Sequence, residues 1–192
     1  MKYTFILALL TFGSSFINGD QPKDYLGIPG PIEFDSTNYT LSWSLSPNAT
    51  YFKQEYLPPN SSLDSYNKMI LIEVVTGDYV LENVVRLKLA ELQQRKKSDP
   101  LVNFQVQNNA EKTEYLLDFL VSEGGSKLAK VEWNAYRYKL FRDKSGKHGV
   151  MIFGLSIRES VHIEDFLKAL PETRKREVNA VESYQTPSVQ IN

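Results

Sequence analysis

Apolar and polar residues alternate along most of this chain, which is the pattern of β-strands with one buried face. Between residues 39 and 45, Leu41, Trp43 and Leu45 alternate with threonine and serine. The same alternation covers residues 102–107, 113–121 and 130–141, and residues 51–57 and 149–157 are predicted to be further strands. Turn residues separate these stretches at short intervals, so an N-terminal hairpin and a later antiparallel meander are predicted.

Two other patterns complete the predicted elements. Residues 69–75 form an almost continuous apolar run rich in β-branched side chains, which predicts a central strand buried on both faces. Apolar side chains recur at helical spacing over residues 79–97, where Asp78 is the expected N-cap, and again over residues 160–184. Pro171 is expected to kink the second helix or to split it in two.

These elements predict a single α+β domain over residues 36–192. Its expected architecture is an antiparallel β-sheet of about six strands, flanked by a crossover helix and a C-terminal helix. Residues 20–35 contain three prolines and two glycines. Because proline and glycine disfavour regular structure, this segment is predicted to be an extended N-terminal arm.

Residues 1–19 have the form of a secretory signal peptide. Lys2 precedes the apolar run 5–10, and small residues follow up to Gly19, a plausible cleavage position. The apolar run is shorter than the roughly 20 residues that a bilayer span needs. A secreted or periplasmic protein with no transmembrane segment in the mature chain is therefore expected, with a buried N-terminal strand or helix as the alternative.

Composition narrows the function classes. The 192 residues include no cysteine and two histidines, and their formal net charge is −1. The absence of cysteine excludes thiol nucleophiles, disulfide frameworks and cysteine-containing zinc sites, and in a secreted chain it favours a bacterial periplasm. A slightly negative chain behind a signal peptide is not expected to bind nucleic acid. N-x-S/T triplets begin at Asn38, Asn48 and Asn60; they would be glycan acceptors in a eukaryotic secretory protein, but chance occurrence is favoured.

The order of hairpin, crossover helix, long antiparallel meander and C-terminal helix resembles the Mog1/PsbP-like α/β/α sandwich family. The resemblance covers about residues 34–184 and is carried by segments such as 69–75, 115–121 and 150–157. It implies an α/β/α sandwich and a binding or assembly role instead of catalysis. No functional residue of that family is matched here, so the resemblance assigns no site.

The segment from Gly154 to Arg158 comes nearest to a catalytic motif. A nucleophile elbow needs a second glycine where Arg158 stands, so Ser156 is expected on the exposed face of a strand. His148 follows a turn and His162 begins a helix, where solvent exposure is expected. The sequence therefore predicts no catalytic residue, no metal site and no cofactor.

The aromatic residues give the strongest binding candidate. Tyr136 and Tyr138 share one strand face with Asn134, opposite Trp133. If the helices cover only the Trp133 face, these three residues form an aromatic and polar platform for a partner or ligand. The alternative is that both tyrosines pack under a helix with their hydroxyls reaching its rim.

The expected function is a secreted or periplasmic non-catalytic module that binds a protein or envelope component through a sheet face or the N-terminal arm. The alternative is a small-molecule-binding or hydrolytic enzyme with a cleft around Asp118, Glu132 or His148. Convergence of those side chains within hydrogen-bond reach would favour the enzyme. The pattern identifies no ligand and leaves the oligomeric state open.

Overall fold

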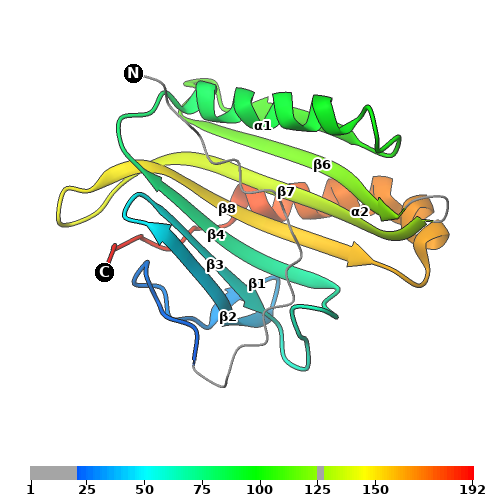
Figure 1. Ribbon diagram of the computed structural model, residues 1–192, viewed down its shortest axis with the longest axis horizontal. Coiled ribbons are helices and arrows are strands. Elements are labelled where there is room, and N and C mark those ends of the chain that lie inside the picture. The colour runs from blue at the N-terminus through cyan, green and yellow to red at the C-terminus, as the bar shows by residue number, and fades with distance from the viewer. Residues whose placement is uncertain (1–20, 125–127) are drawn as a thin grey trace.

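One antiparallel sheet forms the centre of the protein in a computed structural model, which describes residues 21–124 and 128–192 (Figure 1). The expected signal peptide lies outside the described residues. The strands are β1 (Ile32–Phe34), β2 (Thr37–Asn48), β3 (Tyr51–Leu57), β4 (Lys68–Thr76), β5 (Asn103–Asn108), β6 (Glu114–Gly124), β7 (Leu128–Arg142) and β8 (His148–Glu159). Their order across the sheet is β1-β2-β3-β4-β8-β7-β6-β5, and each neighbouring pair is antiparallel.

The α+β class is confirmed, but the sheet has eight strands where about six were predicted. The seven stretches named above, residues 69–75 included, all form strands. The eighth strand, β1, was missed because its three residues are too few to display an alternating period, and they follow directly after Pro31. The apolar run forms β4, which lies between β3 and β8 in the middle of the sheet. Ile70, Leu71 and Ile72 are at most 1% exposed, so the predicted central strand is confirmed.

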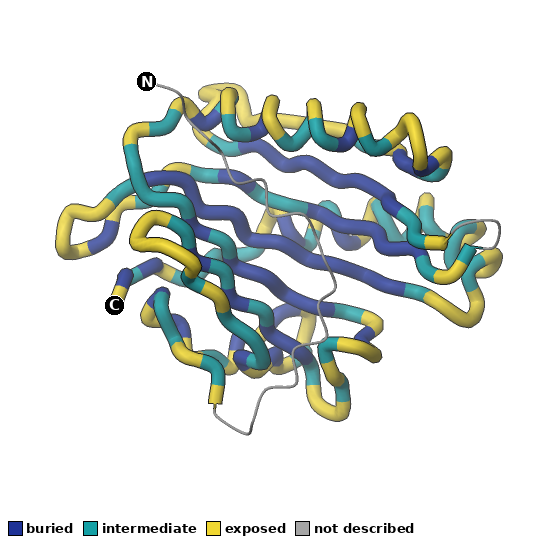
Figure 2. Tube along the Cα trace, in the orientation of Figure 1, coloured by how far each residue is buried: buried dark blue, intermediate teal, exposed yellow. Residues whose placement is uncertain are grey.

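The two helices lie on opposite faces of the sheet. α1 (Leu81–Arg95) contacts β6 and β7, and α2 (Ile163–Ser183) contacts β7 and β8 from the other side (Figure 1). We call these two sides the α1 face and the α2 face. Each face has its own apolar cluster, and the central parts of the strands between them are buried (Figure 2). Neither described helix has the length and apolar content that crossing a bilayer requires.

Both helices depart from their predicted ends. α1 begins at Leu81, its N-cap position is Val80, and no side chain caps it. Asp78 is therefore not the N-cap, because its carboxylate lies 2.8 Å from Nε2 of His148 instead. α2 runs through Pro171 as one element and is not split. Apolar side chains on both sides of the proline pack against the same cluster on the α2 face, which holds the two halves together.

The predicted arm packs onto the domain. Leu26, Ile28 and Phe34 are at most 6% exposed and join the α2-face cluster. Val189 and Ile191, from the tail that follows α2, are buried in the same cluster. Outside β1 the described part of the arm has no helix or strand and bends at residues 25–27 and 30. It contributes to the same core as the rest of the domain.

Candidate functional site

The three side chains proposed for an enzyme cleft lie apart. Asp118 belongs to the α2 face, where it accepts hydrogen bonds from Arg174 at 2.5 and 2.9 Å and from Nε1 of Trp133 at 3.3 Å. Glu132 lies on the α1 face, because its neighbour across the β6–β7 pair belongs to the α1-face cluster. His148 begins β8 and is partly exposed beside a turn. The structure thus gives each of the three a separate environment.

Glu132 is part of a buried ion pair. Arg158 faces it directly in the β7–β8 register and donates to its Oε2 from Nε at 2.9 Å and Nη2 at 2.8 Å. The Tyr66 hydroxyl donates to the same oxygen at 2.9 Å, and the guanidinium lies 3.9 Å from the Tyr66 ring centroid. Burial, followed by the charge of Glu132, raises the pKa of Tyr66, so the phenol remains a donor. This cluster ties the segment between β3 and β4 to the sheet.

Ser156 lies inside the sheet and not on an exposed strand face. It is 1% exposed on the α1 face, and its hydroxyl donates to Oδ1 of Asn134 at 2.5 Å. Next to it, a Cβ on Gly154 would lie 2.7 Å from Cγ of Leu71 and 2.9 Å from Cδ1 of Tyr136. The glycine therefore lets two large side chains close over β8, and this segment is shaped for packing.

The proposed tyrosine platform lies partly beneath α1. The platform was predicted on the condition that the helices cover only the Trp133 face. However, α1 covers the face to which the tyrosines belong. Tyr138 is 2% exposed and Asn134 is 1% exposed, whereas Tyr136 is half-buried. Binding by these three residues stays a prediction, and Tyr136 is the member that a partner would reach first.

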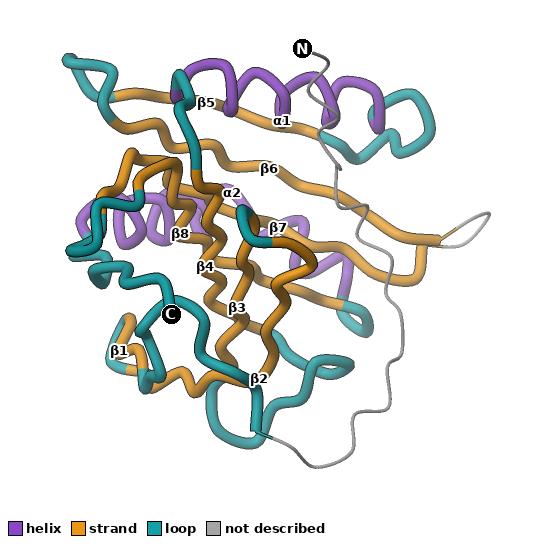
Figure 3. The backbone as a smooth tube through the Cα atoms, turned by 60° about the vertical axis from the view of Figure 1, so that its left-hand side comes forward, coloured by secondary structure: helices purple, strands orange, loops and turns teal. Residues whose placement is uncertain are grey.

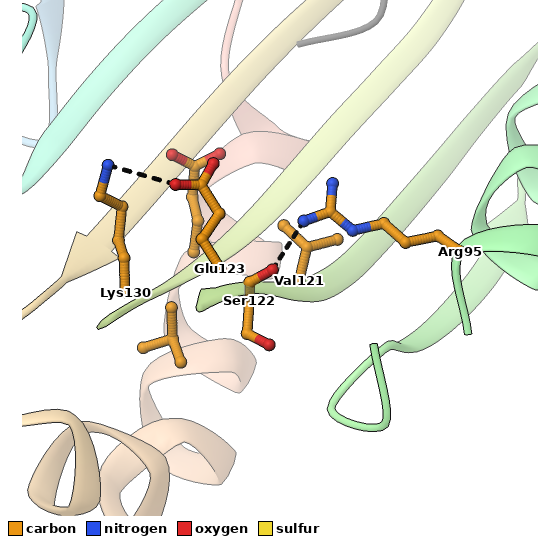
Figure 4. Close-up of a pocket in the computed structure, with 7 residues that line it drawn as sticks. Arg95, Val121, Ser122, Glu123 and Lys130 are labelled. Carbon is orange, nitrogen blue, oxygen red and sulfur yellow. Dashed lines mark hydrogen bonds and ion pairs between the residues drawn. The ribbon is translucent and has the colours of Figure 1, made fainter. Parts of the chain in front are cut away.

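A small pocket lies at the end of the β6–β7 hairpin (Figure 4). Arg95 donates to the Ser122 carbonyl at 2.8 Å on one side, and Lys130 and Glu123 form an ion pair at 3.6 Å on the other. The cavity measures about 10 Å³, which accommodates one water molecule at most. It is too small for a substrate.

A larger groove lies between the arm and the tail, and we call it the arm groove. It measures about 330 Å³, a volume within the range of ligand sites. One wall consists of residues 27–33, including the first two residues of β1. The other wall is formed by Tyr184, Pro187 and Ser188. β1 ends the sheet at this side, so its outer edge presents backbone N–H and C=O groups beside the groove.

Gln54 fixes the wall formed by the arm. Its side chain is fully buried, and its Oε1 accepts hydrogen bonds from the backbone N–H of Tyr25 at 2.7 Å and of Leu26 at 3.1 Å. The Tyr56 hydroxyl donates to the Ile28 carbonyl at 2.7 Å. Two polar side chains of β3 therefore replace strand pairing as partners of the arm backbone.

The tail wall is held where it meets the arm. The N–H groups of Gln190 and Asn192 donate to the carbonyls of Leu26 and Tyr25, at 2.8 and 3.0 Å. Gly27 has a φ of +66°, and a Cβ there would lie 3.1 Å from Gln190. Glycine suits this crossing because it accepts both the backbone angle and the close approach. The two segments meet at this crossing, and the groove opens beside it.

The arm groove carries one negative charge. Among the residues that line it, Glu33 is the charged one, and it is exposed. Burial, followed by the charge of Glu33, raises the pKa of Tyr184, so the phenol keeps its proton. The groove thus offers one carboxylate, one phenol and backbone polar groups, which suits an uncharged or basic ligand.

Sequence reasoning identified the arm but missed its partners. Gln54 occupies an ordinary polar position in a predicted strand, and Tyr184 was placed on an apolar helix face. Proline and glycine at residues 27–31 were the available signal for the groove. Across residues 21–124 and 128–192, no group of three or more His, Cys, Asp or Glu side chains is arranged to hold a metal ion.

Comparison with known proteins gives a family but no activity. Neither the curated proteins nor the solved structures contain a match to this chain. A family model matches residues 26–186, which include all eight strands, both helices, the arm wall of the groove and Tyr184. The chain therefore belongs to this family, which is uncharacterised.

Proposed function

We propose that this protein is a secreted or periplasmic, non-catalytic binding module that holds an extended segment of a protein or envelope partner in the arm groove. The groove itself carries the proposal, because it is an open volume of about 330 Å³ between two extended segments at the end of a sheet. An extended peptide can pair with the backbone of an edge strand and place alternate side chains in neighbouring hollows.

The chemistry of the walls defines the partner further. Pro29, Pro31 and Pro187 make the walls stiff, so little conformational entropy is lost when a partner binds. Glu33 favours a neutral or basic segment over an acidic one. The separate environments of Asp118, Glu132 and His148 favour binding over a hydrolytic cleft, and the resemblance in element order to a fold with binding roles agrees with this choice.

Site-specific cross-linking tests the groove. A photoreactive amino acid in place of Ser188 should give a discrete adduct with one partner when the chain is exposed to the envelope extract of its own organism. The matched control carries the same amino acid in place of Ser98, an exposed serine after α1 and away from the groove. An adduct at residue 188 alone supports the proposal, whereas identical adducts from both variants, or none from either, would contradict it.

Charge reversal tests the chemistry of the partner. Glu33→Lys should lower the yield of the adduct at residue 188, since it reverses the charge of the groove. Glu111→Lys makes the same change on an exposed turn between β5 and β6 and should leave the yield unchanged. Equal yields from both variants would argue against recognition of a basic segment beside Glu33.

Processing of the N-terminus tests the location. The chain expressed with its own first 19 residues should be recovered outside the cytoplasm with Asp20 as its first residue. Intact-mass measurement of the recovered protein distinguishes this product from an unprocessed chain. An unprocessed chain that stays in the cytoplasm would refute secretion without deciding whether the groove binds a partner.

A further inference from the structure

The outer edge of the sheet at β5 lacks the charged residues, proline and bulge that usually protect an edge strand against pairing. β5 is the last strand in the sheet order and lies beside α1 at the outer edge (Figure 3). Its six residues include no charged residue and no proline, and its pairing with β6 runs without a register shift. Native proteins usually interrupt such edges with lysine, proline or a bulge, because an open edge is a template for another strand.

The side chains of β5 form two distinct faces. Phe104 and Val106 pair with Phe119 and Leu117 of β6, so they lie on the α1 face. Val106 is 44% exposed, although it is a large apolar residue, and Phe104 is half-buried. The opposite face carries only amides, from Asn103, Gln105 and Gln107. A strand that pairs here must therefore be apolar on one face and uncharged on the other.

We propose that β5 pairs antiparallel with β5 of a second copy of this chain, which joins the two sheets into one continuous sheet. A two-fold axis perpendicular to the sheet keeps the α1 faces of both copies on the same side. Residues that face each other must then both have odd numbers or both have even numbers, because strand side chains alternate between faces. This holds only when the two-fold axis passes through a residue position and not between two residues.

The register centred on Gln105 is self-complementary. It places Phe104 of each copy opposite Val106 of the other, so the exposed valine gains an aromatic neighbour at both positions. Asn103 faces Gln107, and Gln105 faces its own counterpart, so amides meet amides. No charge is desolvated along the six residues. The opposite edge of the sheet is a poor substitute, since β1 has three residues, of which Glu33 is charged and exposed.

Solution mass and one substitution test the pairing. The purified chain should have twice the mass of its monomer at micromolar concentrations, as measured by light scattering. Val106→Lys should raise the dissociation constant roughly tenfold or more, because it removes two apolar cross-strand pairs and adds the residue that protects edges. Leu87→Lys is the matched control, since Leu87 is 43% exposed on α1 and lies outside β5. A monomer at every concentration, or equal effects of the two lysines, would overturn the proposal.

Disulfide trapping tests the register, because the chain has no cysteine of its own. Facing residues of an antiparallel pair have Cβ atoms about 5 Å apart, so two copies of Gln105→Cys should form a covalent dimer on oxidation. Gln107→Cys changes the same residue type on the same face. Its two copies would be offset by four residues, about 13 Å, and should not cross-link. Equal cross-linking of both variants, or none by Gln105→Cys, would contradict this register.

Discussion

The two edge strands of the sheet, β1 and β5, differ in how other chain segments surround their outer edges. At the β1 end, the strand is short and the arm and tail fold around it, with Leu26 fully buried. At the β5 end, six uncharged residues form an edge with no described strand beyond them, and five of the six are exposed. Chain segments that enclose an edge leave a groove for a ligand, whereas a bare edge favours the addition of a whole strand.

The comparison also explains how each end is stabilised. The arm and tail contribute apolar side chains to the α2-face cluster, and Gln54 supplies hydrogen bonds to their backbone. β5 depends on its pairing with β6 and on partial burial of Phe104. Equivalent substitutions at the two ends should therefore differ greatly in their effect on the free energy of unfolding.

The largest effect is expected for Leu26→Ala in the arm. Leu26 is fully buried in the α2-face cluster, so truncation removes apolar contacts and leaves a cavity, which should lower the free energy of unfolding by about 3 kcal/mol. Urea titration followed by circular dichroism measures this change. A loss below about 0.5 kcal/mol, the usual size for a surface site, would show that the arm is not part of the cooperative core.

A smaller loss in the free energy of unfolding is expected when the hydrogen bonds between Gln54 and the arm backbone are removed. Gln54→Ala leaves the N–H of Tyr25 without its acceptor, whereas the N–H of Leu26 keeps Oδ1 of Asp24 at 3.0 Å. The lost acceptor should cost about 2 kcal/mol. Amide hydrogen exchange should also accelerate at Tyr25, more than at Leu26, while the exchange rates of the β4 amides stay unchanged. Gln93→Ala is the control, because Gln93 is exposed on α1. If both alanine variants are equally stable, the assigned role of Gln54 is wrong.

A smaller change in the free energy of unfolding is expected at acid pH, where the Asp143 carboxylate beside the tail loses its charge. Burial acts to raise the pKa of Asp143, but hydrogen bonds from Ser145, Ile191 and Lys147 outweigh it and hold this pKa below its usual value. The carboxylate therefore stabilises the tail above the ordinary carboxyl pKa of about 3.9, and this contribution disappears as the pH falls through the lowered pKa.

Asp143→Asn should remove that part of the pH dependence. The variant should be less stable than the wild-type chain near neutral pH, and the difference should narrow below about pH 4. Urea midpoints at several pH values measure the difference. Asp165→Asn on α2 is the control, since its carboxylate is exposed and lies 3.8 Å from Lys168. A constant difference between Asp143→Asn and wild type across the acid range would contradict a charge effect.

The smallest effect on stability is expected for Val106→Ala on β5. Val106 is 44% exposed, so its truncation in the dilute monomer should change the free energy of unfolding by no more than about 0.5 kcal/mol. The same urea titration as for Leu26→Ala, made at low protein concentration, gives the direct comparison of the two edges. A loss similar to that of Leu26→Ala would mean that the β5 edge is as tightly packed as the arm.

Patterns of neighbouring residues were enough to predict most of the strands and both helices. Residues 39–45 show the period of two of a strand, although a register shift between Leu41 and Trp43 interrupts that period in β2. Residues 69–75 show the continuous apolar run of a central strand. These patterns could be identified because alternation across a strand and 3.6-residue periodicity in a helix depend on neighbours in the chain. β1 was missed because three residues are too few to show a period.

Which faces are covered, where the arm packs and which strands form the edges depend on contacts between segments far apart in the chain. Gln54 meets Leu26 across a separation of 28 residues, and nothing local distinguishes it from other polar strand residues. The burial of Ser156, the position of Asp78 and the location of α1 over the tyrosine face depend likewise on where distant elements pack. Packing between distant segments selects one arrangement among many with the same local pattern, and for this reason the groove and the bare edge became visible only in the folded chain.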